Sequence, residues 1–67
     1  MPDRSLLTEY GAAELLGITP ERVRRLVKSG VIPYVVLPGN IRRFSPEDLR
    51  GWVTTHRRPA TEELATR

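Results

Sequence analysis

The stretch ELLGITPERVRRLVKSG, residues 14–30, places a tight turn between two helical segments. Thr19 can cap the second segment with its hydroxyl, and Pro20 then takes the first helical position, where its missing N–H leaves no hydrogen bond unmade. Gly30 follows the last helical residue, where a chain commonly leaves a helix in the left-handed conformation. The stretch therefore predicts a helix, a turn and a second helix of about ten residues.

The second helix separates apolar residues from charged ones. Val23, Leu26 and Val27 recur at helical spacing, which predicts one narrow stripe facing a core. The other faces carry four cations and one acid, namely Arg22, Arg24, Arg25, Lys28 and Glu21. A short cationic amphipathic helix after a glycine turn is typical of the recognition helix of a helix-turn-helix motif.

The composition sets the class of protein. The 67 residues suit one small domain, and the absence of cysteine excludes disulfides and thiolate metal sites. The single histidine, His56, cannot hold a metal alone, so we expect no metal and no cofactor. A net charge of +3 and a pI near 10.2 suit a polyanionic partner. No apolar run approaches a membrane span and no signal peptide is evident, so we expect a soluble cytoplasmic protein.

The residues before the turn predict a first helix from Glu9 to Leu16 that is capped by Thr8. Ala13 is small enough to let the second helix cross closely, and Gly17 tolerates a positive φ in the turn. Gly11 inside the helix should cost roughly 1 kcal/mol relative to alanine. We expect four residues to face inward, namely Ala12, Ala13, Leu15 and Leu16.

The residues after the second helix predict a β-hairpin, or wing. The run 31–37 is rich in β-branched residues, 38–40 is Pro-Gly-Asn, and 41–44 returns. Arg42 and Arg43 lie beside the tip. Strand alternation puts Arg42 and Phe44 on one face, so an inward Phe44 would carry Arg42 inward unless the strand end frees it.

A third helix begins at the best start signal in the chain. Ser45 caps, Pro46 follows, and two acids complement the helix dipole. We expect Leu49, Trp52 and Val53 to face the core and the helix to end near His56. The predicted fold class is mostly α with a small β-hairpin, a winged helix-turn-helix over residues 1–58, followed by a mobile tail over 59–67.

At this point the chain resembles a known family. The run LLTEYGAAELLGITPERVRRLVKSGVIP, a hairpin, and then RRFSPEDLRGWV are similar to the small excisionase-type, MerR-like winged helix-turn-helix proteins. The resemblance covers about 6–53. Larger MerR regulators add a long dimerisation helix and an effector domain, neither of which is evident here. The resemblance therefore points to the stand-alone excisionase type.

The resemblance implies that the second helix and the wing contact different parts of the DNA. The second helix would enter the major groove and the wing would follow the backbone or the minor groove. The implied contacts are Glu21, Arg22, Arg24, Arg25 and Lys28 on the helix, and Asn40, Arg42 and Arg43 on the wing. Arginine reads guanine O6 and N7 best, so Arg22 and Arg25, at i and i+3, are our first choices for base edges.

Each of these residues also has a plainer interpretation. Arg24 and Lys28 fit phosphates, but a basic helix face can simply be solvated. Arg42 and Arg43 could only protect an edge strand. We expect Tyr10 and Tyr34 to pack half-buried more readily than to bind phosphate, and we expect Trp52 in the core.

The function expected on these grounds is that of an excisionase. Such a recombination directionality factor would bind repeated sites cooperatively with neighbouring copies of itself, bend the double-stranded DNA and help an integrase excise a phage or integrative element. A small MerR-like transcription regulator is the alternative, and a protein-interaction module with an acidic partner is a remote one. No nucleophile motif or phosphate loop supports an enzyme.

Overall fold

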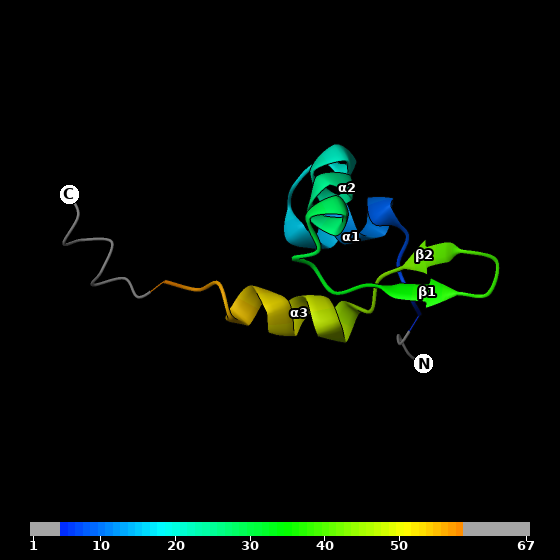
Figure 1. Cartoon of the computed structure of the whole chain (residues 1–67). Helices are drawn as coiled ribbons and strands as arrows, with labels where there is room; N and C mark the ends of the chain where they lie inside the picture. Colours follow the sequence, from blue (N-terminus) through cyan, green and yellow to red (C-terminus); the bar gives the residue numbers. More distant parts are fainter. Residues whose placement is uncertain (1–4, 59–67) are drawn as a thin grey trace.

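The computed structural model describes residues 5–58. The elements follow in the order α1 (Glu9–Leu16), α2 (Pro20–Ser29), β1 (Val35–Leu37), β2 (Ile41–Arg43) and α3 (Pro46–Thr54). Helices α1 and α2 pack together, β1 and β2 project beside them as an antiparallel hairpin, and α3 runs beneath the helix pair in the view of Figure 1. The predicted fold class, a three-helix domain with a wing, is confirmed. The expected tail over 59–67 lies outside the described residues.

Side-chain caps fix where the three helices begin. The hydroxyls of Thr8, Thr19 and Ser45 accept the amide N–H three residues further on, at 3.2, 3.2 and 3.3 Å. Gly17 and Gly30 end α1 and α2 with φ of 72° each, a conformation that glycine adopts without a steric penalty. The starts of all three helices and the ends of the first two therefore agree with the prediction.

The core lies where α1, α2 and α3 meet the loop after α2. Ala13 is 2% exposed, as expected for a close crossing of α1 and α2. Leu15 and Leu16, which were expected inside, are only half-buried at the border of the core. The buried residues of the described chain are Ala12, Ala13, Val23, Val27, Ile32, Phe44 and Leu49.

Gly11 has a packing role that its helix propensity does not indicate. A Cβ at this position would lie 3.2 Å from the Cβ of Leu7. Leu7 is itself fixed, because its backbone exchanges hydrogen bonds of 2.7 and 2.8 Å with Phe44. The glycine therefore gives Leu7 room to close the core over the start of α1.

The hairpin is shorter than the sequence predicted. β1 covers three residues of the expected run 31–37, because Ile32 enters the core and Pro33 has no N–H to donate to a ladder. β2 ends at Arg43, and Phe44 pairs with Leu7 instead of with β1. The pleat therefore does not continue to Phe44, and Arg42 is exposed while Phe44 is buried.

Helix α3 docks on the core through Leu49 and Trp52. Leu49 is fully buried, and the half-buried Trp52 donates from Nε1 to the carbonyl oxygen of Val31 at 2.6 Å. The helix ends at Thr54, two residues before the predicted end. The prediction for Val53 was wrong: it is 41% exposed, because the second half of α3 extends past the helix pair (Figure 1).

Candidate nucleic-acid interface

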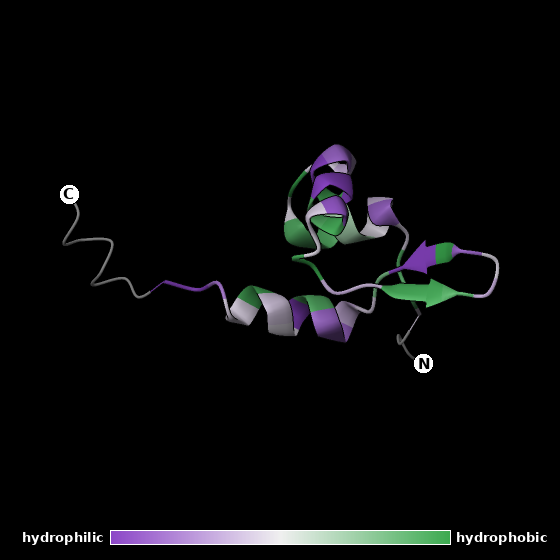
Figure 2. Cartoon of the chain, viewed as in Figure 1, coloured by the Kyte–Doolittle hydropathy of each residue, from purple (hydrophilic) through white to green (hydrophobic). Residues whose placement is uncertain are grey.

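The exposed side of α2 carries the predicted recognition residues. Val23 and Val27 turn inward and Leu26 is half-buried, so the apolar stripe of this helix is used by the core. The other residues of α2 are mostly hydrophilic (Figure 2). All five charged residues of the helix are exposed, namely Glu21, Arg22, Arg24, Arg25 and Lys28.

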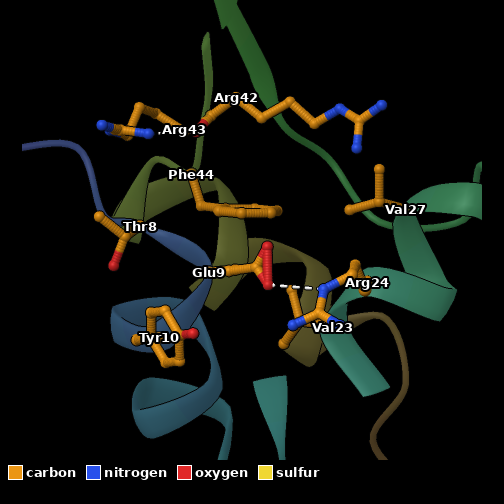
Figure 3. Close-up of a pocket in the computed structure, with 9 residues that line it drawn as sticks. All are labelled: Thr8, Glu9, Tyr10, Val23, Arg24, Val27, Arg42, Arg43 and Phe44. Carbon is orange, nitrogen blue, oxygen red and sulfur yellow. Dashed lines mark hydrogen bonds and ion pairs between the residues drawn. The ribbon is translucent and has the colours of Figure 1, made fainter. Parts of the chain in front are cut away.

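Arg24 is held by a carboxylate from the other helix. Its Nε donates to Oε1 of Glu9, in the first turn of α1, at 2.8 Å (Figure 3). The hydrogen bond, together with the charge of Glu9, raises the pKa of Arg24 above its ordinary value, so the guanidinium stays charged. The sequence pattern indicated Glu9 only as the first residue of this helix. The partner was missed because the two residues are 15 positions apart and meet only once α1 and α2 are packed.

The wing borders the same region. An open hollow of about 360 Å³ lies between the start of α1, the middle of α2 and the end of β2. Within it, Arg42 reaches toward α2 on the side of Val27, whereas Arg43 points away from α2 and donates to the carbonyl oxygen of Arg42 at 2.8 Å (Figure 3). The lining residues are Thr8, Glu9, Tyr10, Val23, Arg24, Val27, Arg42, Arg43 and Phe44.

The tip side of the wing adds the remaining predicted residue. Asn40, in the turn, has a φ of 64° and lines a neighbouring hollow together with Arg42 and Glu9. The Cζ atom of Arg42 lies 5.9 Å from the centre of the Tyr34 ring, within the range of a cation–π contact. Arg42 and Arg43 thus line one hollow with Arg24 and Glu9, whereas Asn40 lines the neighbouring hollow.

Arg22 and Arg25 lie elsewhere around the helix. At 3.6 residues per turn, Arg22 is about 160° away from Arg24. Both Arg22 and Arg25 line a hollow with Leu26 and Trp52, on the side of α2 that faces α3. Arg25 also forms an exposed ion pair with Glu21, with Nη2 and Oε2 3.5 Å apart. The two arginines chosen first for base contacts therefore lie away from the wing.

Tyr10 is more exposed than expected. Tyr10 is 67% exposed and Tyr34 is 40% exposed, so the expected half-buried packing is wrong for Tyr10. Tyr10 is in the first turn of α1, which is short and contributes its small Ala12 and Ala13 to the core instead. Its ring lines the hollow beside Glu9 and Arg24 and adds a hydroxyl to the cationic face.

Comparison with known proteins gives one match. Residues 7–57 match a family described as Helix-turn-helix domain, which spans α1, α2, the hairpin and α3. Neither the curated proteins nor the solved structures give a match. Within residues 5–58, no helix combines the length and hydropathy needed to cross a membrane.

Proposed function

The chain belongs to the helix-turn-helix domain family, and from this premise we propose that it binds double-stranded DNA with α2 in the major groove and the hairpin against the adjacent backbone. The observation that carries the proposal is the grouping of cations from distant segments around one hollow. Arg24 of α2 lines this hollow together with Arg42 and Arg43 of the wing. A recognition helix and a wing that present cations to one side fit a duplex, whose phosphates flank the groove that the helix enters.

By their positions, the exposed cations divide into residues that contact base edges and residues that contact phosphates. Arg25 lies near the outermost line of α2, opposite the buried Val23, so its guanidinium is well placed for base edges. Lys28, a compact charge in the last turn, suits a phosphate. Arg22 lies at the flank that faces α3, and we assign it to the backbone at the edge of the groove. Asn40, Arg42 and Arg43 are assigned to phosphates beside the wing.

Binding to DNA can be tested with two variants of α2 on two duplexes. One duplex is selected by the protein from a random library, and the other has the same composition in scrambled order. Arg25→Ala should weaken binding to the selected duplex by roughly 1–3 kcal/mol and to the scrambled duplex by less, because it removes a base contact. Lys28→Ala should weaken both alike. Equal losses on both duplexes for Arg25→Ala would remove it as a reader.

Salt dependence tests the phosphate contacts and the remote alternative together. With about five phosphates contacted, the logarithm of the affinity should fall with the logarithm of the salt concentration with a slope near −4.5. A protein-interaction module whose basic face meets an acidic protein would show weak, sequence-independent duplex binding. A shallow slope with no preference between the two duplexes would therefore favour that module over a DNA-binding protein.

Within DNA binding, we assign the protein to excision of an integrated element, as a recombination directionality factor that acts with an integrase. The order helix, turn, helix, wing and capped α3 supports this assignment through its similarity to the excisionase type. A small MerR-like transcription regulator would use the same surface, since a fold does not fix a function. Footprinting on the DNA around the gene separates the two. Protection of repeated sites at an attachment region, with loss of excision in cells without the protein, is expected; protection of a promoter alone with normal excision would contradict it.

A further inference from the structure

We propose that Glu9 is a positioning residue that holds Arg24 as a reader of base edges. The inference rests on the proposed DNA-binding function and assigns Arg24 a different role from the phosphate contact predicted from the sequence. It is carried by the contact between Nε of Arg24 and Oε1 of Glu9 at 2.8 Å, which joins the first turn of α1 to the middle of α2. It defines a specificity determinant that lies partly outside the recognition helix.

The geometry of the guanidinium explains what the contact does. An arginine has five N–H donors in a rigid planar fork. The bond to Glu9 uses Nε, and it is the one side-chain hydrogen bond that Arg24 makes within residues 5–58. Both Nη groups are left to donate, and two parallel N–H donors match O6 and N7 of guanine. A fork fixed at Nε also loses less conformational freedom when it binds than a free arginine would lose.

The charge of Glu9 makes Arg24 a poor phosphate contact. Phosphate binding depends on net positive charge, because it releases the cations condensed on DNA. The carboxylate of Glu9 offsets the charge of Arg24 and repels a phosphate that approaches it. Lys28, one turn further along the same side of α2, has no ion-pair partner in the described part of the chain. The two cations are therefore suited to different parts of the duplex.

The side chain of Arg24 is more exposed than the carboxylate that orients it. The side chain of Arg24 is 53% exposed, and that of Glu9, which lines the same hollow, is 33% exposed. The reading group is thus the more accessible one, and the carboxylate that orients it is the more covered one. Arg42 and Arg43 border the same hollow, so the wing would hold the DNA strand that Arg24 faces.

The test uses Glu9→Ala, Glu9→Gln and Arg24→Ala with the full chain, on the library-selected and the scrambled duplex. Arg24→Ala should reduce the preference for the selected duplex roughly 5- to 150-fold, the range for one bidentate base contact. Glu9→Ala should reduce this preference in the same direction, while affinity for the scrambled duplex rises and the salt slope steepens by about one, because Arg24 is released to a phosphate. Glu9→Gln keeps an oxygen acceptor for Nε and should restore part of the preference.

Glu14→Ala is the matched control, because Glu14 is an exposed acid of the same helix without an ion-pair partner in the described residues. This variant should raise the affinity for both duplexes by the same factor and leave the preference for the selected duplex unchanged. In the Arg24→Ala background, Glu9→Ala should no longer alter the preference. If Glu9→Ala behaves like Glu14→Ala, the ion pair only ties α1 to α2 and the inference is overturned, while DNA binding by the wild type stands. If the wild type binds neither duplex, the proposed function fails and the inference fails with it.

Discussion

Gly11 and Gly51 both lie inside helices, yet their surroundings differ. A Cβ at Gly51, on the exposed side of α3, would meet no atom within 4 Å. A Cβ at Gly11 would lie 3.2 Å from two carbons of Leu7, whose backbone is bonded to Phe44 on both its donor and its acceptor side. Glycine is a weak helix former in both places, but only Gly11 is required by packing.

The contrast predicts opposite effects for one substitution. Gly51→Ala should raise the free energy of unfolding by up to about 1 kcal/mol, because alanine restricts the unfolded chain and fits the helix. Gly11→Ala should lower it, since the new methyl group must push against the side chain of Leu7, whose backbone is held by Phe44. Thermal melts of the two variants beside the wild type decide this. A Gly11→Ala protein that melts above the wild type would show that Leu7 does not constrain α1.

For single residues, the sequence predicts the interactions that depend on near neighbours in the chain. The Thr8, Thr19 and Ser45 caps each act over three residues, so their signals are local. The pair of Glu9 and Arg24 could not be predicted, because it depends on how two helices cross. The exposure of Tyr10 has the same origin, since the crossing leaves its side of α1 uncovered.

Among the elements, α2 depends most on its start. It is ten residues long and carries cations on most of its surface, and a helix of this length is marginal in water without tertiary support. The Thr19 hydroxyl satisfies the amide N–H of Arg22, and Pro20 fills the first helical position. The cap therefore supports the element that would enter the DNA groove.

Thr19→Ala should lower the free energy of unfolding by about 1 kcal/mol, because it leaves an amide at the start of α2 without its acceptor. Thr19→Ser keeps the hydroxyl and should stay close to the wild type. Chemical denaturation of the three proteins gives the comparison. Equal losses for alanine and serine would attribute the effect to the methyl group of the threonine and not to the cap.

For the helices and strands, the sequence-based prediction fails at the ends of the elements. The β-branched run 31–37 indicates extended chain, but pairing needs free N–H groups and a partner strand, so only three residues join the ladder. Val53 follows the helical period of Leu49, but it is 41% exposed on an open hollow that it lines with Leu16 and Trp52. Both differences come from the shape of neighbouring elements, which cannot be inferred from the local sequence pattern.

At the scale of the whole molecule, the predicted order of elements was confirmed, whereas the orientation of α2 was not predictable. The sequence shows a basic helix and a basic wing, but not which flank of the helix faces the wing. The structure places Arg24 toward the wing and Arg22 toward α3. The interface is therefore asymmetric, with six cations spread over two sides of α2 and the hairpin, and two carboxylates, Glu9 and Glu21, among them.

The size of this interface limits what one copy can recognise. Helix α2 spans ten residues, roughly 15 Å, and reaches only a few base pairs. Single modules of this size bury about 600–1,000 Å² on DNA. An interface of that area is too small to select one site against a genome of competing sequences, so we expect specific binding to require several copies on neighbouring sites.

We therefore predict cooperative head-to-tail loading that curves the DNA and brings integrase-bound sites together. Bending on this scale costs a few kcal/mol, which the summed phosphate contacts of several copies would offset. A titration on duplexes with one, two and three sites, with gel mobility followed for bending, measures both effects. Affinity per site and bend should rise together from one site to three. Full affinity for a single isolated site, with no gain from a neighbour, would show that one domain recognises its target alone.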